Sequence, residues 1–174
     1  MGNVRGVDHI GLTVIDIEEA HRFLTDGLGA ELMYDLLPPG SSLEGPEVEK
    51  LVEVPAGTKI TLARMYRLAG GPSIELFHYV VDDQRAALRA CDVGFQHVAL
   101  FVEDIEAAAE KMVAAGGRQM AEPWGMIGPE SGEDNRFCFV KAPFGAMFEL
   151  VSYGDQAYMR QTSKRKWRPG AGME

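Results

Sequence analysis

Two histidines and two glutamates occupy matching positions in the two halves of the sequence. His9 and His97 each open a short apolar segment, and Glu75 and Glu149 each lie near the end of a later one. Imidazole nitrogens and carboxylate oxygens are donor groups that hold divalent metal ions in proteins. A carboxylate near such an ion can also accept a proton from carbon. These four residues are therefore the first candidates for a functional site.

The matching positions come from an internal repeat. Residues 7–33 and 95–120 align with His9 on His97, and the same Asp-Ile-Glu tripeptide begins seven residues later in both copies. A match of this length is better explained by duplication than by chance. The repeat predicts that the two halves share one fold.

Each half is predicted to fold as strand, helix, strand, strand, strand. Alternating apolar residues at the start of each copy predict a strand. The Asp-Ile-Glu tripeptide predicts a helix N-terminus, since acidic side chains favour the positive end of the helix dipole. Residues 59–80 and 135–154 each predict two strands joined by a glycine-containing turn. Between the halves, residues 84–90 predict a short helix.

Two long segments, 38–59 and 121–134, follow the second predicted strand of each half. Connections of this length in a compact domain are more often functional than decorative. Their apolar side chains, among them Leu43 and Trp124, suit a neutral and partly apolar small molecule. The sequence leaves the role of residues 38–59 open.

Strand alternation indicates which of these side chains share a face. Residues two or four apart on a strand point the same way, so Tyr153 shares a face with Glu149 and either orients a substrate or fills the interior. The duplication pairs His9 with His97 and Glu75 with Glu149. A pseudo-twofold axis between the halves would then bring two imidazoles and two carboxylates together.

Each of these residues taken alone has a simpler interpretation. A single histidine on a strand more often belongs to the core or the surface than to a metal site, and a single inward-facing glutamate often pairs with an arginine. His21 and His78 lie outside the repeat and are interpreted as structural, with His21 on the solvent-facing side of its helix. Because both residue types are duplicated at matching positions, a metal site is the stronger interpretation of the other two histidines.

Composition excludes several classes of function. The chain has 174 residues, which fits one domain spanning 1–174, and a net charge of −9. This charge disfavours nucleic acid and anionic membranes as partners. The two cysteines have no metal-binding spacing, and no apolar run is long enough for a signal peptide or a membrane span. We therefore expect a cytoplasmic protein that acts on a small molecule.

The HxxLxV…DI motif that opens each half and the Glu-Leu pair near the end of each half resemble the vicinal oxygen chelate superfamily. This superfamily contains glyoxalase I, methylmalonyl-CoA epimerase, extradiol dioxygenases and bleomycin-resistance proteins, and the resemblance covers residues 7–154. It implies an α+β fold in which paired βαβββ modules form a curled mixed sheet around a metal site. The expected boundaries are module one at 5–81, a linker at 82–94, module two at 95–154 and a C-terminal tail, rich in basic residues, at 155–174.

The resemblance also implies a ligand set. One divalent ion, whether zinc, nickel, cobalt, manganese or iron, would be held by four side chains and leave two positions open for adjacent substrate oxygens. Members with paired modules often dimerise, which implies a homodimer. The sequence leaves open whether the ligands come from one chain or two. The implied metal ligands are His9, Glu75, His97 and Glu149.

Three functions are consistent with this resemblance. The first is a metal-dependent isomerase, epimerase or lyase that moves a proton next to the carbonyl of a small hydroxy-ketone or acyl-type substrate through a metal-stabilised enediolate. The second is an extradiol-type dioxygenase, against which Glu75 argues because a fourth ligand would occupy a position that oxygen or substrate needs. The third is a metal-free binding protein of the bleomycin-resistance type, against which the retained ligand set argues.

Within the first class, the two glutamates are the candidate catalytic residues. Glu149, or Glu75 once released from the metal, would remove the proton, and the other carboxylate would return it to the opposite face. Sugar-derived cyclitol epimerases also resemble this ligand set. The sequence leaves the substrate and the native metal open.

Overall fold

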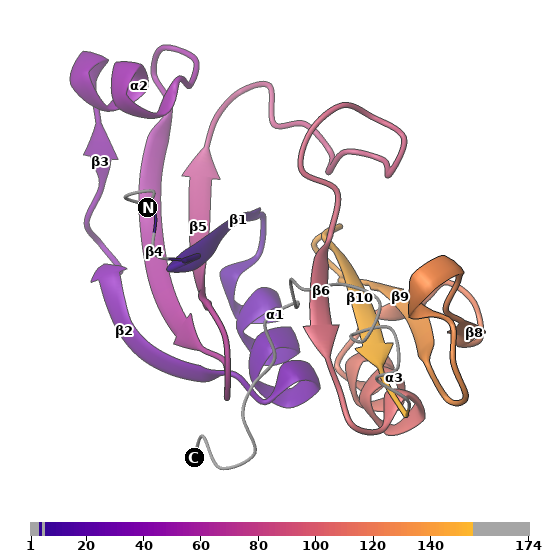
Figure 1. The fold of residues 1–174 in the computed structure, drawn as a ribbon. Helices are drawn as coiled ribbons and strands as arrows, with labels where there is room; N and C mark the ends of the chain where they lie inside the picture. The colour runs from indigo at the N-terminus through magenta and orange to yellow at the C-terminus, as the bar shows by residue number, and fades with distance from the viewer. Residues whose placement is uncertain (1–3, 5, 155–174) are drawn as a thin grey trace.

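The computed structural model of the protein describes residue 4 and residues 6–154; the tail at 155–174 lies outside the described residues. The strands of the first half are β1 (His9–Val14), β2 (Glu31–Leu37), β3 (Leu43–Glu44), β4 (Lys59–Arg67) and β5 (Ser73–Val80). Those of the second half are β6 (Val98–Phe101), β7 (Arg118–Gln119), β8 (Trp124–Gly125), β9 (Arg136–Lys141) and β10 (Met147–Ser152). They form two separate five-stranded sheets, one from each half (Figure 1).

The two sheets have the same topology. The strand order is β1-β5-β4-β2 in the first sheet, with β3 beside β4, and β6-β10-β9-β7 in the second, with β8 beside β9. In each sheet the first strand of the half runs parallel to the last, and the other neighbours are antiparallel. This arrangement confirms the predicted α+β fold with a duplicated βαβββ order.

Both helices begin where the Asp-Ile-Glu tripeptides predict. Helix α1 (Ile17–Arg22) continues as a π-helical turn, η1 (Phe23–Gly27), and α3 (Ile105–Ala114) is its counterpart. The Asp16 carboxylate accepts hydrogen bonds from two backbone N–H groups of the first turn, and Asp104 accepts one. No helix within the described residues has the length and apolar character needed to cross a bilayer.

The two long segments carry structure of their own. Residues 38–59 contain β3 and helix α2 (Pro46–Val52), and residues 121–134 contain β8 and the short helix η2 (Gly128–Glu130). Helix α2 has no fully buried residue, but Val48 packs on a small apolar cluster of the first sheet. The residues of this cluster are Leu37, Ile60, Ala63, Phe77 and Tyr79.

The helix predicted for residues 84–90 is wrong. These residues are not helical and are all exposed. A helix of two turns gains too few hydrogen bonds to offset its nucleation cost unless one face is buried, and every residue of this segment is exposed.

One core joins both halves. Helices α1, η1 and α3 pack together, and one face of each sheet covers them. The contact is close at Gly117, where a Cβ atom would lie 2.7 Å from the carbonyl oxygen of Met112 and 2.9 Å from the Phe23 ring. The core residues include Phe23, Leu24, Tyr66, Ile74, Leu76, Met112, Val140, Phe148 and Leu150.

The opposite face of each sheet does not contact these helices, and we call it the open face. Glu75 lies between two buried residues of β5, Ile74 and Leu76, and Glu149 is placed in the same way in β10. Because side chains alternate along a strand, both glutamates project from open faces. The residues that the repeat singles out therefore point away from the core.

Tyr66 provides a test of the polar contacts within the core. Its side chain is fully buried, and its hydroxyl lies 2.9 Å from His21 Nδ1, so the prediction that His21 faces solvent is wrong. Replacing Tyr66 by Phe should lower the free energy of unfolding by about 1 kcal/mol, because the buried hydrogen bond is lost. Urea unfolding measures this, with the half-exposed Tyr34→Phe as the control. Equal stability of Tyr66→Phe and wild type would show that the bond contributes nothing.

Candidate metal centre

The first histidine–glutamate pair lies on the open face of the first sheet. The parallel pairing of β1 with β5 places His9 Nε2 3.2 Å from Glu75 Oε2. His9 Nδ1 lies 2.8 Å from Asp8 Oδ1. The hydrogen bond to Asp8 raises the pKa of His9; partial burial opposes this, and the charges of Glu75 and Asp8 add to it.

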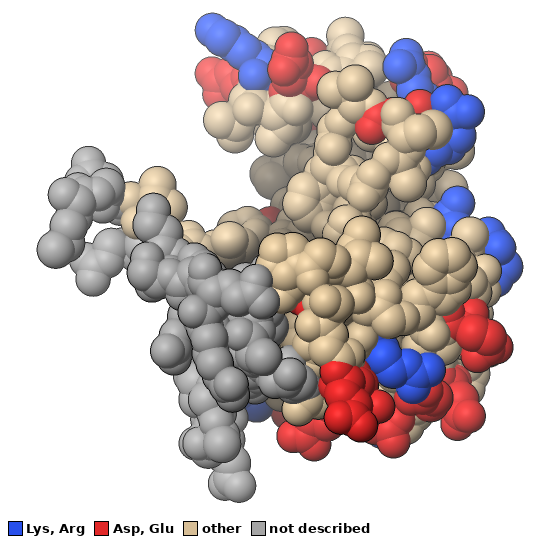
Figure 2. All heavy atoms as spheres, turned by 45° about the vertical axis from the view of Figure 1, so that its right-hand side comes forward, with Lys and Arg blue, Asp and Glu red and all other residues tan. Residues whose placement is uncertain are grey.

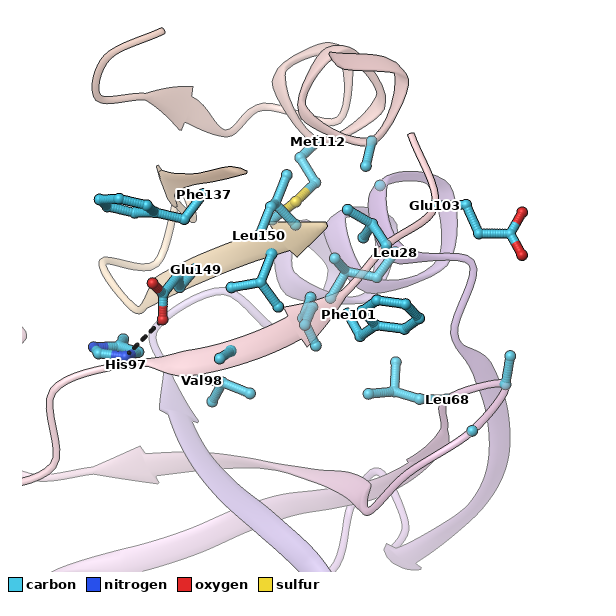
Figure 3. Close-up of a pocket in the computed structure, with 18 of the residues that line it drawn as sticks. Leu28, Leu68, His97, Val98, Phe101, Glu103, Met112, Phe137, Glu149 and Leu150 are labelled. Carbon is cyan, nitrogen blue, oxygen red and sulfur yellow. Dashed lines mark ion pairs between the residues drawn. The ribbon is translucent and has the colours of Figure 1, made fainter. Parts of the chain in front are cut away.

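The second pair repeats this geometry on the second sheet. His97 Nε2 lies 3.1 Å from Glu149 Oε2, and His97 Nδ1 lies 2.9 Å from Gln96 Oε1 (Figure 3). When Nδ1 donates to an oxygen, Nε2 keeps its lone pair, which here faces a carboxylate that can only accept. A cation between the two would satisfy both groups, and an oxygen acceptor on the other ring nitrogen is the usual support of a metal-binding histidine. Both pairs therefore fit half of a metal site.

The two pairs do not converge within one chain. Among residues 4 and 6–154, no group of three or more His, Cys, Asp or Glu side chains is placed to hold a metal ion. The structure brings His9 to Glu75 and His97 to Glu149, but it leaves the pairs on the open faces of two different sheets. Both sheets pack on the shared helical core with the faces opposite their open faces. This packing fixes the positions of the sheets and keeps the two pairs apart.

A pocket of about 1290 Å³ lies along β6 beside the second pair. His97 and Glu149 line it, and aromatic rings continue along the same open face (Figure 3). The His97 ring is 5.4 Å from that of Phe139, which is 6.0 Å from that of Phe137. The pocket wall therefore combines one histidine–glutamate pair with a largely apolar surface that includes Phe137.

The charged residues along this pocket are mostly acidic. Among the described residues that line it, Lys111 is the one cation. Figure 2, which brings this side of the molecule forward, shows a broad uncharged area with charged residues gathered along its margins. The pocket favours a neutral molecule over an anionic one. The acidic residues that line it are Asp26, Glu103, Asp104, Glu130 and Glu149.

The open face of the first sheet is also apolar beyond its pair. The ring centroids of Phe77 and Tyr79 lie 5.8 Å apart. Burial raises the pKa of Tyr79, and the negative charge of Glu75 adds to this effect. Both sheets thus present a histidine–glutamate pair next to aromatic side chains.

Sequence reasoning missed the residues that hold the histidine rings. Asp8 and Gln96 precede the two histidines at the same offset in the repeat, and each supplies an oxygen to Nδ1. Each of them precedes its histidine by one residue, and this shared position was the signal in the sequence that could have identified them. The two residue types differ, so the alignment of identical residues does not include them.

The chain is similar to proteins of a known superfamily. The model of the Glyoxalase/Bleomycin resistance protein/Dioxygenase superfamily matches residues 6–150. The chain belongs to this superfamily, which is the vicinal oxygen chelate group that the sequence resembles. Among curated proteins, the chain is 34% identical over 167 residues to a 2-epi-5-epi-valiolone epimerase of an Actinomyces species, covering 94% of this chain and 88% of that protein.

Solved structures of the superfamily share the fold. A glyoxalase family protein from Bacillus cereus has a TM-score of 0.66 at 17% identity, over 87% of this chain and 95% of that one. A second neighbour is a variant of the fosfomycin resistance protein FosX from Listeria monocytogenes, in complex with Mn(II) and 1S,2S-dihydroxypropylphosphonic acid. Its TM-score is 0.57 at 16% identity, and the match covers 91% of this chain and 98% of that one. Glyoxalase I from Zea mays has a TM-score of 0.57 at 21% identity, with 86% of this chain covering 45% of that one.

Proposed function

We propose that the protein is a metal-dependent epimerase of a neutral, hydroxylated ketone. The observation that carries this proposal is the duplicated pair: two histidines, each with Nδ1 held by an oxygen and Nε2 facing a glutamate on an open face. The 34% identity to a 2-epi-5-epi-valiolone epimerase supports the reaction type and a cyclic hydroxylated ketone as substrate.

The residues that would hold the metal are the members of the two pairs, His9, Glu75, His97 and Glu149. When bound, a divalent ion supplies a positive charge that polarises the substrate carbonyl and stabilises the charge developing on its oxygen. Nitrogen and oxygen donors in equal number suit zinc, nickel, cobalt, manganese or iron.

The two glutamates would move the proton. One carboxylate takes the proton from the carbon next to the carbonyl, and the C–H electron pair moves towards the carbonyl oxygen. The other glutamate, released from the metal and protonated as the carboxylic acid, then gives its proton to the opposite face of the same carbon, which inverts its configuration and restores the carbonyl. Both glutamates are mostly shielded, with side chains 14% and 20% exposed, so bulk water has limited access to these oxygens.

The pocket supports a neutral substrate. Acidic residues outnumber the single lysine among the described lining residues, which disfavours phosphonates, phosphates and carboxylates. Aromatic rings along the open face suit the apolar faces of a ring, and carboxylates suit its hydroxyl groups.

We further propose that a second copy of the chain completes each metal site. Within the described residues the two pairs do not meet, so the first pair of one copy and the second pair of another would form the four-ligand set. The edge strand β2 supports this association, because an exposed apolar edge commonly marks an interface. The exposed apolar residues of β2 are Leu32, Met33, Tyr34 and Leu36.

Metal content tests the proposal. Protein purified without a histidine tag should carry on the order of one divalent ion per chain, and His97→Ala should lose most of it because one nitrogen ligand is removed. Elemental mass spectrometry measures this. The matched control is His78→Gln, which alters a histidine outside both pairs whose Nδ1 lies 2.6 Å from the Thr61 hydroxyl.

Two outcomes would contradict the epimerase. Protein that takes up no ion after incubation with zinc, nickel, cobalt and manganese would favour the metal-free binding protein. Iron as the native metal, together with oxygen consumption on a catechol, would favour the dioxygenase.

A further inference from the structure

Two aromatic residues follow Glu75 on the open face of the first sheet. Phe77 and Tyr79 lie two and four residues after Glu75 on β5, so their side chains project from the same face as its carboxylate. Both are half-buried, and their ring centroids lie 5.8 Å apart with an angle of 44° between the ring planes. The face that carries the first histidine–glutamate pair therefore continues as a short aromatic surface.

The Phe77 ring reaches back toward this pair. Gly11 of β1 is the register partner of Glu75, and a Cβ atom at Gly11 would lie 3.7 Å from Cε2 of Phe77. The ring thus leans along the sheet to the level of Glu75, over a position that carries no side chain. A ligand held at the pair would have the Phe77 ring as its next neighbour on this face.

Apolar packing holds Tyr79 at the far end of the aromatic surface. Tyr79 lies beside Ile60 of β4, its register partner, and packs on the same buried cluster as Val48 of helix α2. Helix α2 is itself tied to the segment that follows it, because the Glu49 carboxylate accepts the backbone N–H of Gly57 at 2.7 Å. The Tyr79 ring is therefore positioned by packing and not by a bond to its hydroxyl group.

The hydroxyl group of Tyr79 is available to a ligand. It makes no hydrogen bond within the part of the chain that the structure describes. No buried side-chain oxygen or nitrogen of these residues lacks a partner, so this hydroxyl group reaches the molecular surface. Burial of the ring and the negative charge of Glu75 raise the pKa of Tyr79, so the phenol keeps its proton and can donate a hydrogen bond.

We propose that Phe77 and Tyr79 form a substrate subsite, in which the Phe77 ring packs against the apolar face of a hydroxylated ring and the Tyr79 hydroxyl binds one of its hydroxyl groups. The inference rests on the proposed function, because the ketone must be held at the histidine–glutamate pair for its ring to lie on this surface. An aromatic face suits the C–H groups of such a ring, and a phenol both donates to and accepts from a hydroxyl group. The subsite adds to the proposed function a side chain that selects among hydroxylation patterns.

Tyr79→Phe tests the hydroxyl contact in metal-loaded protein. The probes are 2-epi-5-epi-valiolone and a series of analogues in which one hydroxyl at a time is replaced by hydrogen. By calorimetry, Tyr79→Phe should bind the parent ketone about 3- to 10-fold more weakly because one neutral hydrogen bond is lost, and KM should rise by the same factor with kcat and metal content unchanged. One analogue should bind wild type and Tyr79→Phe equally, because it lacks the hydroxyl group that Tyr79 contacts.

Phe77→Leu tests the aromatic contact. Leucine keeps an apolar side chain on the buried cluster but has no aromatic face, so the parent ketone and every analogue should bind more weakly by the same factor. Tyr66→Phe is the matched control for loss of a tyrosine hydroxyl. Its hydroxyl contacts His21 within the core, so this variant should be less stable than wild type and keep the wild-type KM.

The outcomes separate the subsite from the epimerase. If Tyr79→Phe binds the parent ketone and every analogue as wild type does, the hydroxyl contact is wrong, and wild-type binding of the series by Phe77→Leu would exclude the ring contact in the same way. If wild type binds the ketone without inverting its carbon, the epimerase proposal fails, and binding by the variants still tests the subsite. If wild type neither binds nor converts any of these ketones, both proposals fail.

Discussion

Glu149→Gln is expected to abolish inversion of the substrate carbon, and Glu75→Gln is expected to do the same. An amide has the size and shape of the carboxylate but no useful affinity for a proton, so it removes the base and leaves the pocket in place. Loss of a general base lowers turnover by about 100- to 10,000-fold. Incubation with 2-epi-5-epi-valiolone in D2O, followed by proton NMR at the carbon next to the ketone, measures inversion and exchange separately. The glutamate left in each variant can still exchange the proton on its own face.

Two controls make this result specific to proton transfer. Metal content, measured on each variant, separates loss of the base from loss of a ligand, since an amide oxygen is a weaker donor than a carboxylate. Glu31→Gln changes an exposed glutamate that pairs with Arg67, away from both histidine–glutamate pairs, and should exchange as wild type does. Inversion retained in either Glu75→Gln or Glu149→Gln would rule out the two-base mechanism.

The candidate residues could be predicted from the sequence because the duplication amplifies a weak signal. One histidine on one strand carries little information, but His9 and His97 occupy the same position in two copies of a long repeat. Alternation then places Glu75 and Glu149 on one face each, and the structure confirms that both lie between buried neighbours. The succession of strands and helix along each half follows from the same kind of sequence pattern.

The separation of the two pairs could not be predicted. It depends on how the sheets pack on the shared helices, and this packing is set by contacts such as Gly117 against Met112 and Phe23. Phe23 and Gly117 are far apart in the sequence, and no local pattern connects them. Strand periodicity identifies the face that carries each glutamate, but it contains no information on where the other sheet lies.

The hydrogen bond from the Tyr153 hydroxyl to Glu130 Oε1 escaped prediction for a related reason. Tyr153 could be placed on the face of Glu149, but its partner comes from an irregular segment closed by Asn135. Asparagine and glycine indicate turns in general and do not specify which side chain a turn directs toward a strand. The contact is therefore visible only in the folded structure.

Mixed dimers of two inactive variants are expected to recover activity. If each metal site takes its first pair from one copy and its second pair from the other, His9→Ala and His97→Ala each inactivate both sites of their own dimer. A mixed dimer concentrates both defects in one site and leaves the other with four intact ligands. Co-expression with two different tags, followed by sequential purification, should give about half of the wild-type activity, because a twofold dimer contains two equivalent sites.

The control uses the same variant on both tags. A dimer of two His97→Ala chains has no intact site and should stay inactive after the same purification. If mixed dimers are as inactive as this control, the four ligands come from one chain, and the sheets must then rearrange when metal binds. Light scattering on the wild type adds an independent check, since a monomer at working concentration contradicts a shared site.

Recovered activity would also connect metal affinity to association. A site built from two copies exists only in the dimer, so the metal stabilises the dimer and the dimer raises the affinity for metal by the same free energy. Dilution should then release metal from the wild type, and excess metal should oppose dissociation.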